Sequence, residues 1–316
     1  MAVDEHNARK HAKHIDLVVL DDQGKSEESS VAAERLIHSE NVAAIVGCDT
    51  TSRSMAISPI CERAGIAMIS PTASGPALTV SKHFTFRVCA TDDGEAIAIA
   101  HLALERLHAK RVAILRDTKN DYAVGMAETF TKELTRAGGT IVTSLDYSEG
   151  DSDFRAQLTA VKTLEPDALF VPGYYGDVAQ IAAQSRDLGI RTPLIGGSGW
   201  DSPKLIEIGG AALEGSWFAS GMRSASPRFV DSFRKRFGTE PDAASAQAYD
   251  AAMIACNAIA RVGSNRTAVR DAIASTTNYS GASGKITIGP DGNARKPLAV
   301  FHIKDGRFVE MESIAP

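Results

Sequence analysis

Short apolar runs rich in β-branched residues alternate with amphipathic stretches from one end of the chain to the other. This alternation predicts successive β-α units, in which helices connect parallel strands. The fold class is therefore predicted to be α/β. The runs predicted to be strands are Asp16 to Leu20, Val42 to Gly47, Gly65 to Ser70, Phe84 to Val88, Arg111 to Asp117, Thr140 to Leu145, Ala168 to Tyr174 and Pro193 to Gly196.

Between these runs, apolar residues recur at intervals of three and four, which predicts helices that pack one face on a sheet. Clear examples are Phe154, Leu158, Val161 and Leu164, and farther upstream Ile99, Ala103 and Leu107. About eight parallel strands are too many for one small open sheet and lack the regularity of an eightfold barrel. Two sheets of four or five strands are therefore expected.

The end of the chain follows a different pattern. The runs Leu298 to Ile303 and Arg307 to Met311 flank the tripeptide Lys304, Asp305 and Gly306. An Asp-Gly step favours the positive φ angles of a tight hairpin turn. The last strands are therefore predicted to be antiparallel.

Composition narrows the function classes. The 316 residues suffice for about two domains, and the net charge of -5 comes from 34 basic and 39 acidic residues that are interspersed. This balance argues against partners such as nucleic acid or an anionic membrane. No apolar run approaches the roughly 18 residues of a spanning helix, so direct membrane insertion is not expected. The polar start, Met1 to His14, does not have the pattern of a secretory signal.

The cysteines and the first histidines offer little chemistry. The four cysteines, which contain no C-x-x-C pair, are Cys48, Cys61, Cys89 and Cys256. They indicate neither a zinc site nor a disulfide framework. Four buried free thiols are favoured, with one disulfide as the alternative. For the group His6, His11 and His14, a solvated arm is favoured over a metal site because chain termini tend to fray.

Candidate chemistry lies in the loops that follow the strands, since ligands of open α/β sheets bind beyond the carboxyl ends of the strands. The loop Cys48 to Arg53 places hydroxyl groups where a helix begins, and helix capping is an equally good explanation for them. The loop Pro71 to Pro76 consists of small residues that let backbone N–H groups approach an anion. Together the two loops predict a pocket of neutral donors for a carboxylate, with no base for covalent chemistry.

Later loops add aromatic groups. Tyr122 follows one predicted strand, and Tyr174 ends another. Each could offer an apolar face and a hydroxyl to a small solute, although packing alone also places tyrosines there. In the loop Gly196 to Ser202, Asp201 and Ser202 could cap the next helix. No cofactor is predicted, because no G-x-G-x-x-G motif follows a strand, and no catalytic pair of recognisable spacing is present.

In order and spacing, these segments resemble the Leu/Ile/Val-binding protein family, the type I periplasmic binding proteins of ABC importers. The resemblance covers nearly the whole chain. Its segments are Val18 to Gly24 (VVLDDQG), Ile66 to Thr79 (IAMISPTASGPALT), Tyr122 to Ala127 (YAVGMA), Asp153 to Leu158 (DFRAQL), Gly173 to Tyr175 (GYY), Gly199 to Ser202 (GWDS) and Ala248 to Ala251 (AYDA).

The resemblance implies two lobes with three crossings between them, near Ala90 to Gly94, Ser220 to Met222 and Asp291 to Lys296. Lobe 1 would comprise residues 1–91 and 222–293, and lobe 2 residues 92–221 and 294–316. The ligand-binding positions that the resemblance implies are Thr51, Ser52, Ala73 and Ser74 in lobe 1, and Tyr122, Tyr174, Ser198 and Asp201 in lobe 2.

Two departures from the family pattern change these expectations. Amino-acid-binding members usually carry an acidic residue at the position of Ser198, where it neutralises the ammonium group of the ligand. Either Asp201 or Asp49 replaces it here, or the ligand is an amide, a carboxylate without an amine or another small polar solute. In addition, Met1 to Ala8 resembles the end of the family's first helix, which predicts that the natural protein begins upstream with a signal peptide and a first strand.

The function that the resemblance implies is capture of a small polar solute, above all a branched-chain or other amino acid, by closure of two lobes, followed by delivery to a membrane permease. The expected location is the periplasm or the cell exterior. A cytoplasmic sensor of the amide-responsive kind has the same fold and stays an alternative. An enzyme of the doubly wound class is disfavoured, because its phosphate-binding loop is missing.

Overall fold

The computed structural model describes residues 1–221 and 226–314. The chain forms two compact units, Met1–Ala90 with Arg223–Lys296 and Thr91–Met222 with Pro297–Pro316. The boundaries between the units fall at residues 90, 223 and 296. The lobe boundaries that the resemblance implies are residues 91, 222 and 293. The predicted crossing Ser220–Met222 ends on Met222, which lies outside the described residues.

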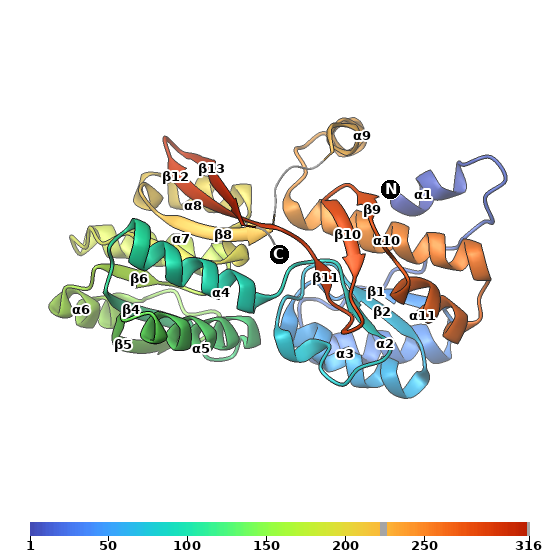
Figure 1. The fold of residues 1–316 in the computed structure, drawn as a ribbon, viewed down its shortest axis with the longest axis horizontal. Coiled ribbons are helices and arrows are strands. Elements are labelled where there is room, and N and C mark those ends of the chain that lie inside the picture. Colours follow the sequence, from blue (N-terminus) through green and yellow to red (C-terminus); the bar gives the residue numbers. More distant parts are fainter. Residues whose placement is uncertain (222–225, 315–316) are drawn as a thin grey trace. The chain divides into compact units, whose positions relative to one another are not determined.

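The first unit contains a parallel sheet in the order β1-β2-β3 and a small antiparallel sheet in the order β11-β10-β9 (Figure 1). In the parallel sheet, Ala44 of β1 is paired with Ala67 of β2, and Met68 of β2 with Thr85 of β3. The elements of this unit are α1 (Ala2–Asn7), α2 (Ser26–His38), β1 (Ala44–Val46), α3 (Thr51–Ala64), β2 (Ala67–Ser70), the 3₁₀ turn η1 (Pro76–Leu78), β3 (Thr85–Arg87), α9 (Pro227–Phe237), α10 (Ala243–Val262), α11 (Arg266–Ala274), β9 (Tyr279–Gly281), β10 (Gly284–Ile288) and β11 (Ala294–Arg295).

Helices cover both faces of the parallel sheet in this unit. Met68 of β2 packs with α2 and α3 on one face, whereas its neighbours Ala67 and Ile69 pack with α10 and α11 on the other. Successive side chains of a strand point to opposite faces, so a strand covered on both faces consists of uninterrupted apolar residues. The apolar run in β2 follows from this arrangement and places the loop after β2 at the carboxyl edge of the sheet.

The predicted strand Asp16 to Leu20 is wrong, because residues 16–20 belong to no helix or strand. Its apolar side chains are largely exposed, Val19 by 76% and Leu17 by 64%. Among the described residues, β1 pairs with β2 alone, and Val46 at its open edge is 41% exposed. A strand needs hydrogen-bonding neighbours, and no described strand offers them to residues 16–20.

The second unit is built on a seven-stranded sheet in the order β13-β12-β8-β7-β6-β4-β5. The strands from β8 to β5 are parallel, and β12 pairs antiparallel with both β8 and β13. Its elements are α4 (Asp92–His101), a π-helical turn η2 (Leu102–Arg106), β4 (Arg111–Asp117), α5 (Asp121–Arg136), β5 (Thr140–Tyr147), α6 (Arg155–Leu164), β6 (Ala168–Phe170), α7 (Tyr175–Asp187), β7 (Leu194–Gly196), the 3₁₀ turn η3 (Ser198–Trp200), α8 (Pro203–Gly209), the 3₁₀ turn η4 (Gly210–Leu213), β8 (Trp217–Gly221), β12 (Leu298–Lys304) and β13 (Arg307–Ile314).

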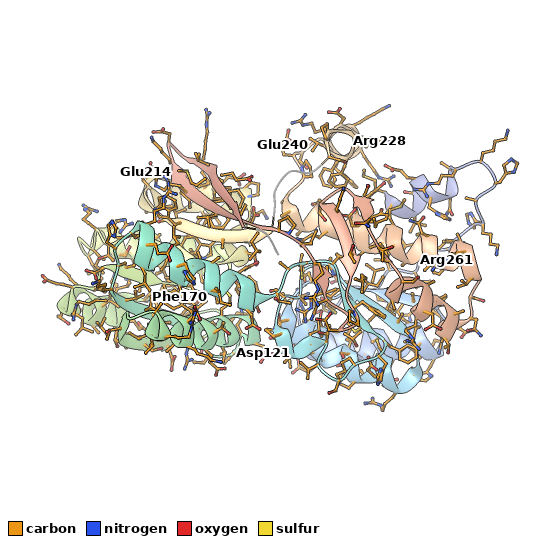
Figure 2. The ribbon with its side chains drawn as sticks, in the orientation of Figure 1. Asp121, Phe170, Glu214, Arg228, Glu240 and Arg261 are labelled. Carbon is orange, nitrogen blue, oxygen red and sulfur yellow. The ribbon has the colours of Figure 1, made fainter. Side chains whose placement is uncertain are left out.

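Here too the sheet is covered on both faces. Val112 and Ile114 of β4 pack against α4 and α5, whereas Ala113 and Leu115 pack with α6, α7 and α8. Phe170 of β6, labelled in Figure 2, lies on the α4–α5 face, and its ring stacks on Phe130 with centroids 4.1 Å apart. The predicted α/β class, with parallel strands flanked by helices, is therefore confirmed.

Several details differ from the sequence-based expectations. The expected sheets of four or five strands are wrong, because β8 to β11 were not predicted and the sheets have three or seven strands in the described residues. Strand β6 ends at Phe170, four residues before the predicted end at Tyr174. The terminal hairpin is confirmed, with Asp305 and Gly306 at φ 51° and 64°.

All four cysteines are free in the structure, and Cys48 is half-buried while the other three are buried. The predicted solvated arm is wrong for His6, which is buried and lies 3.2 Å by its Nε2 from the Lys13 carbonyl oxygen. In the described part of the chain, none of the helices combines the length and apolar character needed to cross a bilayer.

Candidate ligand-binding loops

In the first unit, Ser70 ties together the two loops that follow β1 and β2. Its hydroxyl donates to the Cys48 carbonyl oxygen over 2.6 Å and accepts the Ala73 N–H over 3.0 Å. Ser54 of α3 donates to the same Cys48 carbonyl over 2.9 Å. Sequence reasoning missed Ser70, because a serine that ends a strand has no distinctive spacing.

Thr51 makes a second bridge between these loops. Its Oγ1 accepts the Gly75 N–H over 3.1 Å, and the Thr51 side chain is buried. The carbonyl of Gly75 accepts from Nη2 of the buried Arg87 over 2.7 Å. The Thr51 hydroxyl therefore fixes loop geometry rather than capping α3, whose N-cap residue Thr50 makes no side-chain capping hydrogen bond.

The structure brings Thr51, Ala73 and Ser74 together on these joined loops. The Ser74 residue is buried, yet no described residue hydrogen-bonds to its hydroxyl. Beside it, α3 begins at Thr51, and the amides of a helix's first turn have no intrahelical acceptor and attract anions. Ser52 lies in that first turn. These loops can therefore offer neutral donors to a carboxylate.

Asp49 in the same loop is engaged by Arg53. The Arg53 guanidinium binds Asp49 through Nη2 and Asp22 through Nη1, the latter over 2.8 Å. Its Nε also donates to Thr50 Oγ1 over 3.0 Å. The hypothesis that Asp49 supplies a free carboxylate for a ligand ammonium is therefore not favoured by the structure.

In the second unit, Tyr122 and Tyr174 meet at the carboxyl edge of the sheet. They follow β4 and β6, which are neighbours, while β5 pairs with the opposite edge of β4. Such a reversal of strand order is where α/β sheets place ligands. The two rings stack with centroids 5.5 Å apart and an interplanar angle of 12°.

Both tyrosines sit at helix starts. The side chain of Asn120 accepts the Tyr122 N–H over 3.0 Å and so caps α5, while Tyr174 is the N-cap residue of α7. Tyr122 is buried, and its hydroxyl accepts the Gly199 N–H over 3.1 Å. Tyr174 is half-buried. Tyr122 therefore holds the turn η3, and Tyr174 presents the more accessible ring.

Ser198 begins η3, and its amide is bound by a residue that sequence reasoning missed. The Ser198 N–H donates to Glu95 Oε2 over 2.9 Å. Glu95 belongs to the acidic first turn of α4, a composition that usually reflects the helix dipole alone. Asp201 is turned toward β8, where its Oδ2 accepts from the Ser220 hydroxyl over 2.9 Å.

A further acidic group lies at the same edge of the sheet, around the first turn of α7. Burial and then the nearby Asp117, Glu149 and Asp151 raise the pKa of Asp177 from 3.8 to about 6. The folded state therefore keeps a proton that the unfolded chain loses at lower pH. Ionisation of Asp177 costs folding stability as the pH rises from about 4 to about 6.

The variant Asp177→Asn is expected to be more stable than wild type at pH 8 by about 1 kcal/mol or less, since partial exposure screens the repulsion. Melting temperatures measured at pH 4 and pH 8 should show a stabilisation at pH 8 that shrinks at pH 4. The exposed Glu128→Gln in α5 is the control for removing one charge. A stabilisation that does not depend on pH would contradict this assignment.

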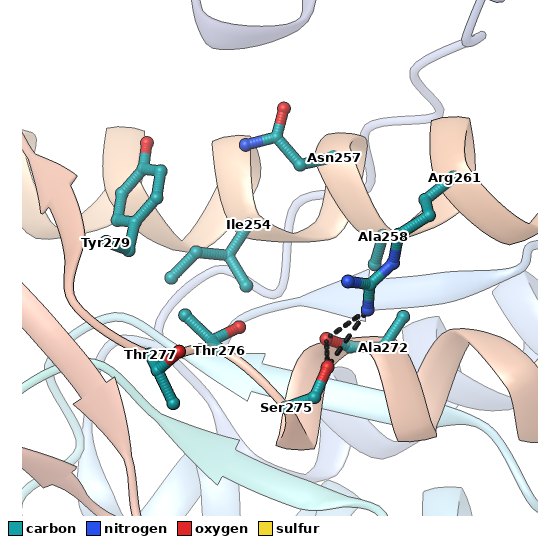
Figure 3. A pocket seen from close by; sticks show the side chains of 9 residues that line it. All are labelled: Ile254, Asn257, Ala258, Arg261, Ala272, Ser275, Thr276, Thr277 and Tyr279. Atoms are coloured by element: carbon teal, nitrogen blue, oxygen red, sulfur yellow. Dashed lines mark hydrogen bonds between the residues drawn. The ribbon is translucent and has the colours of Figure 1, made fainter.

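A cavity of about 310 Å³ lies elsewhere in the first unit, between α10 and α11 (Figure 3). Arg261 lines it, and its Nη2 donates to the Ala272 carbonyl over 3.1 Å and to Ser275 Oγ over 3.0 Å. None of the predicted ligand-binding residues lines this cavity. It is therefore separate from the loops described above.

The chain is similar to periplasmic binding proteins along most of its length. A family model described as periplasmic binding protein matches residues 1–307. Leu/Ile/Val-binding protein homolog 3 of Brucella melitensis is 27% identical over 303 residues, which are 94% of this chain and 82% of that protein.

Two solved structures extend the similarity. A leucine-binding protein from Thermotoga maritima is 35% identical, with a TM-score of 0.94 over 100% of this chain and 93% of the other. The branched-chain amino acid transporter substrate-binding protein of Streptococcus pneumoniae, in complex with isoleucine, is 30% identical, with a TM-score of 0.92 over 100% and 92%. The chain therefore belongs to the periplasmic binding protein family, among the Leu/Ile/Val-binding proteins, as its sequence predicted.

Proposed function

We propose that this chain is the extracytoplasmic solute-binding component of an ABC importer and that its ligand is a branched-chain amino acid, with leucine as the reference ligand. The observation that carries the proposal is Ser74, a buried residue beside the start of α3 whose hydroxyl has no hydrogen-bond partner among the described residues. The names of the similar proteins support the choice of ligand, since they bind leucine or isoleucine.

In the proposed mechanism, the ligand carboxylate binds the first unit at Ser74, Ala73 and the first turn of α3. The second unit then closes over the ligand and contributes the Tyr174 ring and the turn at Ser198. A closed form is favoured only as far as the ligand binds it more tightly than the open form. A membrane permease that recognises the closed form is the proposed partner, and the periplasm or cell exterior the proposed location.

Calorimetry with L-leucine, L-isoleucine and L-valine tests this function. We expect binding, and at 100 times Kd a ligand that binds only the native state adds about 2.7 kcal/mol to its stability. Loss of the Ser74 hydroxyl in Ser74→Ala should weaken leucine binding about 10-fold or more, since a hydrogen bond to a charged group contributes about 1.5–3 kcal/mol.

Thr159→Ala is the matched control for Ser74→Ala, because it also removes one hydroxyl, on the exposed face of α6. Its affinity for leucine should stay within about 3-fold of wild type. Equal affinities of wild type and Ser74→Ala would refute the assigned carboxylate site. Absence of any heat of binding or rise in melting temperature with all three amino acids would refute the proposed ligand class.

A further inference from the structure

The proposed ligand carries an ammonium group, and Ser198 has no charge to balance it. The two substitutes considered from the sequence are both occupied, Asp49 by Arg53 and Asp201 by Ser220. Burying an ammonium without a counterion costs several kcal/mol. The second unit must therefore supply another carboxylate if an amino acid is the ligand.

Glu95 has the position that this role requires. Its Oε2 lies 2.9 Å from the Ser198 amide nitrogen. A side chain at Gly197 would place its Cβ 3.0 Å from Glu95 Oε2 and 2.6 Å from the Tyr122 hydroxyl oxygen. The carboxylate and the Tyr122 hydroxyl thus flank the backbone of the same turn. Glu95 therefore lies directly beside the backbone of Gly197 and Ser198.

Glu95 also lacks a balancing charge among the residues that the structure describes. It is only 2% exposed, and among the described residues its hydrogen-bond donors belong to Ser198 and no cation forms an ion pair with it. Burial, followed by the charges of Asp92 and Asp201, raises the pKa of Glu95 well above its ordinary range. A cation bound nearby would relieve this repulsion.

We propose that Glu95 is the counterion for the ligand's α-ammonium group and that it makes the site select α-amino acids over carboxylic acids that lack the amine. This inference rests on the proposed function and assigns its ammonium subsite to α4 rather than to the loop at Ser198. The Glu95 carboxylate acts on the ligand at the turn η3, because it already binds the Ser198 amide of that turn. The neutral Ser198 is then compatible with an amino-acid ligand.

The proposal implies that ligand binding releases a proton. The groups that face Glu95 are Asp92 on its own helix, Asp201 after η3 and Tyr122 on α5, and none of them supplies a positive charge. A bound ammonium stabilises the ionised carboxylate and lowers its pKa. At pH values between the pKa of Glu95 in the free protein and its lower pKa in the complex, leucine binding therefore releases the Glu95 proton.

The test compares L-leucine with L-2-hydroxy-4-methylpentanoate, which has the same shape but no amine. By calorimetry, Glu95→Gln should bind leucine about 10- to 100-fold more weakly, as expected for loss of a charge-assisted interaction. Its affinity for the hydroxy acid should change less than about 3-fold. An unchanged affinity for leucine, or equal losses for both compounds, would overturn the proposal.

Two further measurements guard against a folding defect. In wild type, the heat of leucine binding between pH 5 and 8 should depend on the ionisation enthalpy of the buffer. The heat of hydroxy-acid binding should not. A heat of leucine binding that is independent of the buffer at every pH would overturn the proposal. The double variant Glu95→Gln with Ser198→Glu should recover leucine affinity. Glu105→Gln, an exposed change in η2, should leave affinity unchanged.

These results separate the two proposals. If wild type and Glu95→Gln bind leucine equally well, the role of Glu95 as counterion is refuted, whereas the proposed function is not. Wild type that binds neither leucine nor the hydroxy acid nor the other branched-chain amino acids refutes the proposed function itself.

Discussion

Gly199→Ala is expected to weaken leucine binding by about 100-fold or more, because it displaces the turn that is proposed to carry the ammonium side of the site. A methyl group at Gly199 would lie 2.5 Å from the Gly173 carbonyl oxygen, and 3.1 Å from both Tyr122 Cε1 and Tyr174 Cδ1. The first contact involves backbone on both sides, so neither partner can rotate away. The turn must move, which breaks the Gly199 N–H bond to Tyr122 and shifts Ser198 away from Glu95.

Calorimetry with leucine checks this expectation, with circular dichroism to verify that Gly199→Ala is folded. Gly176→Ala is the matched control, since Gly176 lies inside α7, where a methyl group meets no atom within 4 Å. It should leave affinity unchanged and stabilise α7 by up to about 1 kcal/mol. A folded Gly199→Ala protein that binds leucine as tightly as wild type would show that η3 is no part of the site.

The parallel strands were predictable because a single physical constraint shapes them. A strand such as β4 is buried on both faces, so Arg111–Asp117 carries a continuous apolar stretch that the sequence displays directly, and its observed bounds are the predicted ones. The strand β8 has the equally buried sequence Trp217–Gly221. It escaped prediction because it contains no β-branched residue and ends in serine and glycine, and because it follows a 3₁₀ turn rather than a long helix.

The strand predicted at Asp16 to Leu20 shows the limit of local patterns. Its residues have the composition of a strand, but a strand exists only where a neighbour supplies hydrogen bonds, and that condition is not local. The loop residues Thr51 and Tyr122 illustrate a related limit. Their positions near the carboxyl edges were predicted, but their hydroxyls bind the backbones of Gly75 and Gly199, partners 24 and 77 residues away.

Glu95 could not have been singled out from its sequence context. An acidic residue in the first turn of a helix is ordinarily explained by the helix dipole. What distinguishes Glu95 is burial beside the Ser198 amide, which lies 103 residues farther along the chain. A contact between residues so far apart in the sequence becomes visible only when the fold is known.

The largest loss of stability is expected from Asp250→Ala in α10. The Asp250 carboxylate is fully buried and accepts the N–H groups of Ala282 and Ser283 over 2.6 and 2.8 Å. It also accepts the Ser283 hydroxyl, which in turn accepts from Nζ of the buried Lys296 over 2.5 Å. Removing it leaves two amides and the Ser283 hydroxyl without their acceptor and takes the nearby negative charge from the buried ammonium of Lys296, at a cost of about 3–5 kcal/mol.

Denaturation with urea can assign this loss to one unit of the chain. Both tryptophans, Trp200 and Trp217, belong to the second unit, so their fluorescence reports on that unit, whereas circular dichroism reports on both. Asp250 belongs to the first unit, and its replacement should lower the dichroism transition more than the fluorescence transition. If the two units unfold together, both transitions fall equally.

Lys296→Met separates the carboxylate's roles. If Asp250 mainly compensates the buried ammonium, adding Lys296→Met to Asp250→Ala should recover about 1–3 kcal/mol, because the uncompensated charge is gone. If it mainly holds the Ala282 and Ser283 amides, the double variant should be no more stable than Asp250→Ala. The exposed Asp271→Ala in α11 controls for loss of one carboxylate and should change stability by less than about 1 kcal/mol. An Asp250→Ala protein within that same margin of wild type would refute the structural role of this carboxylate.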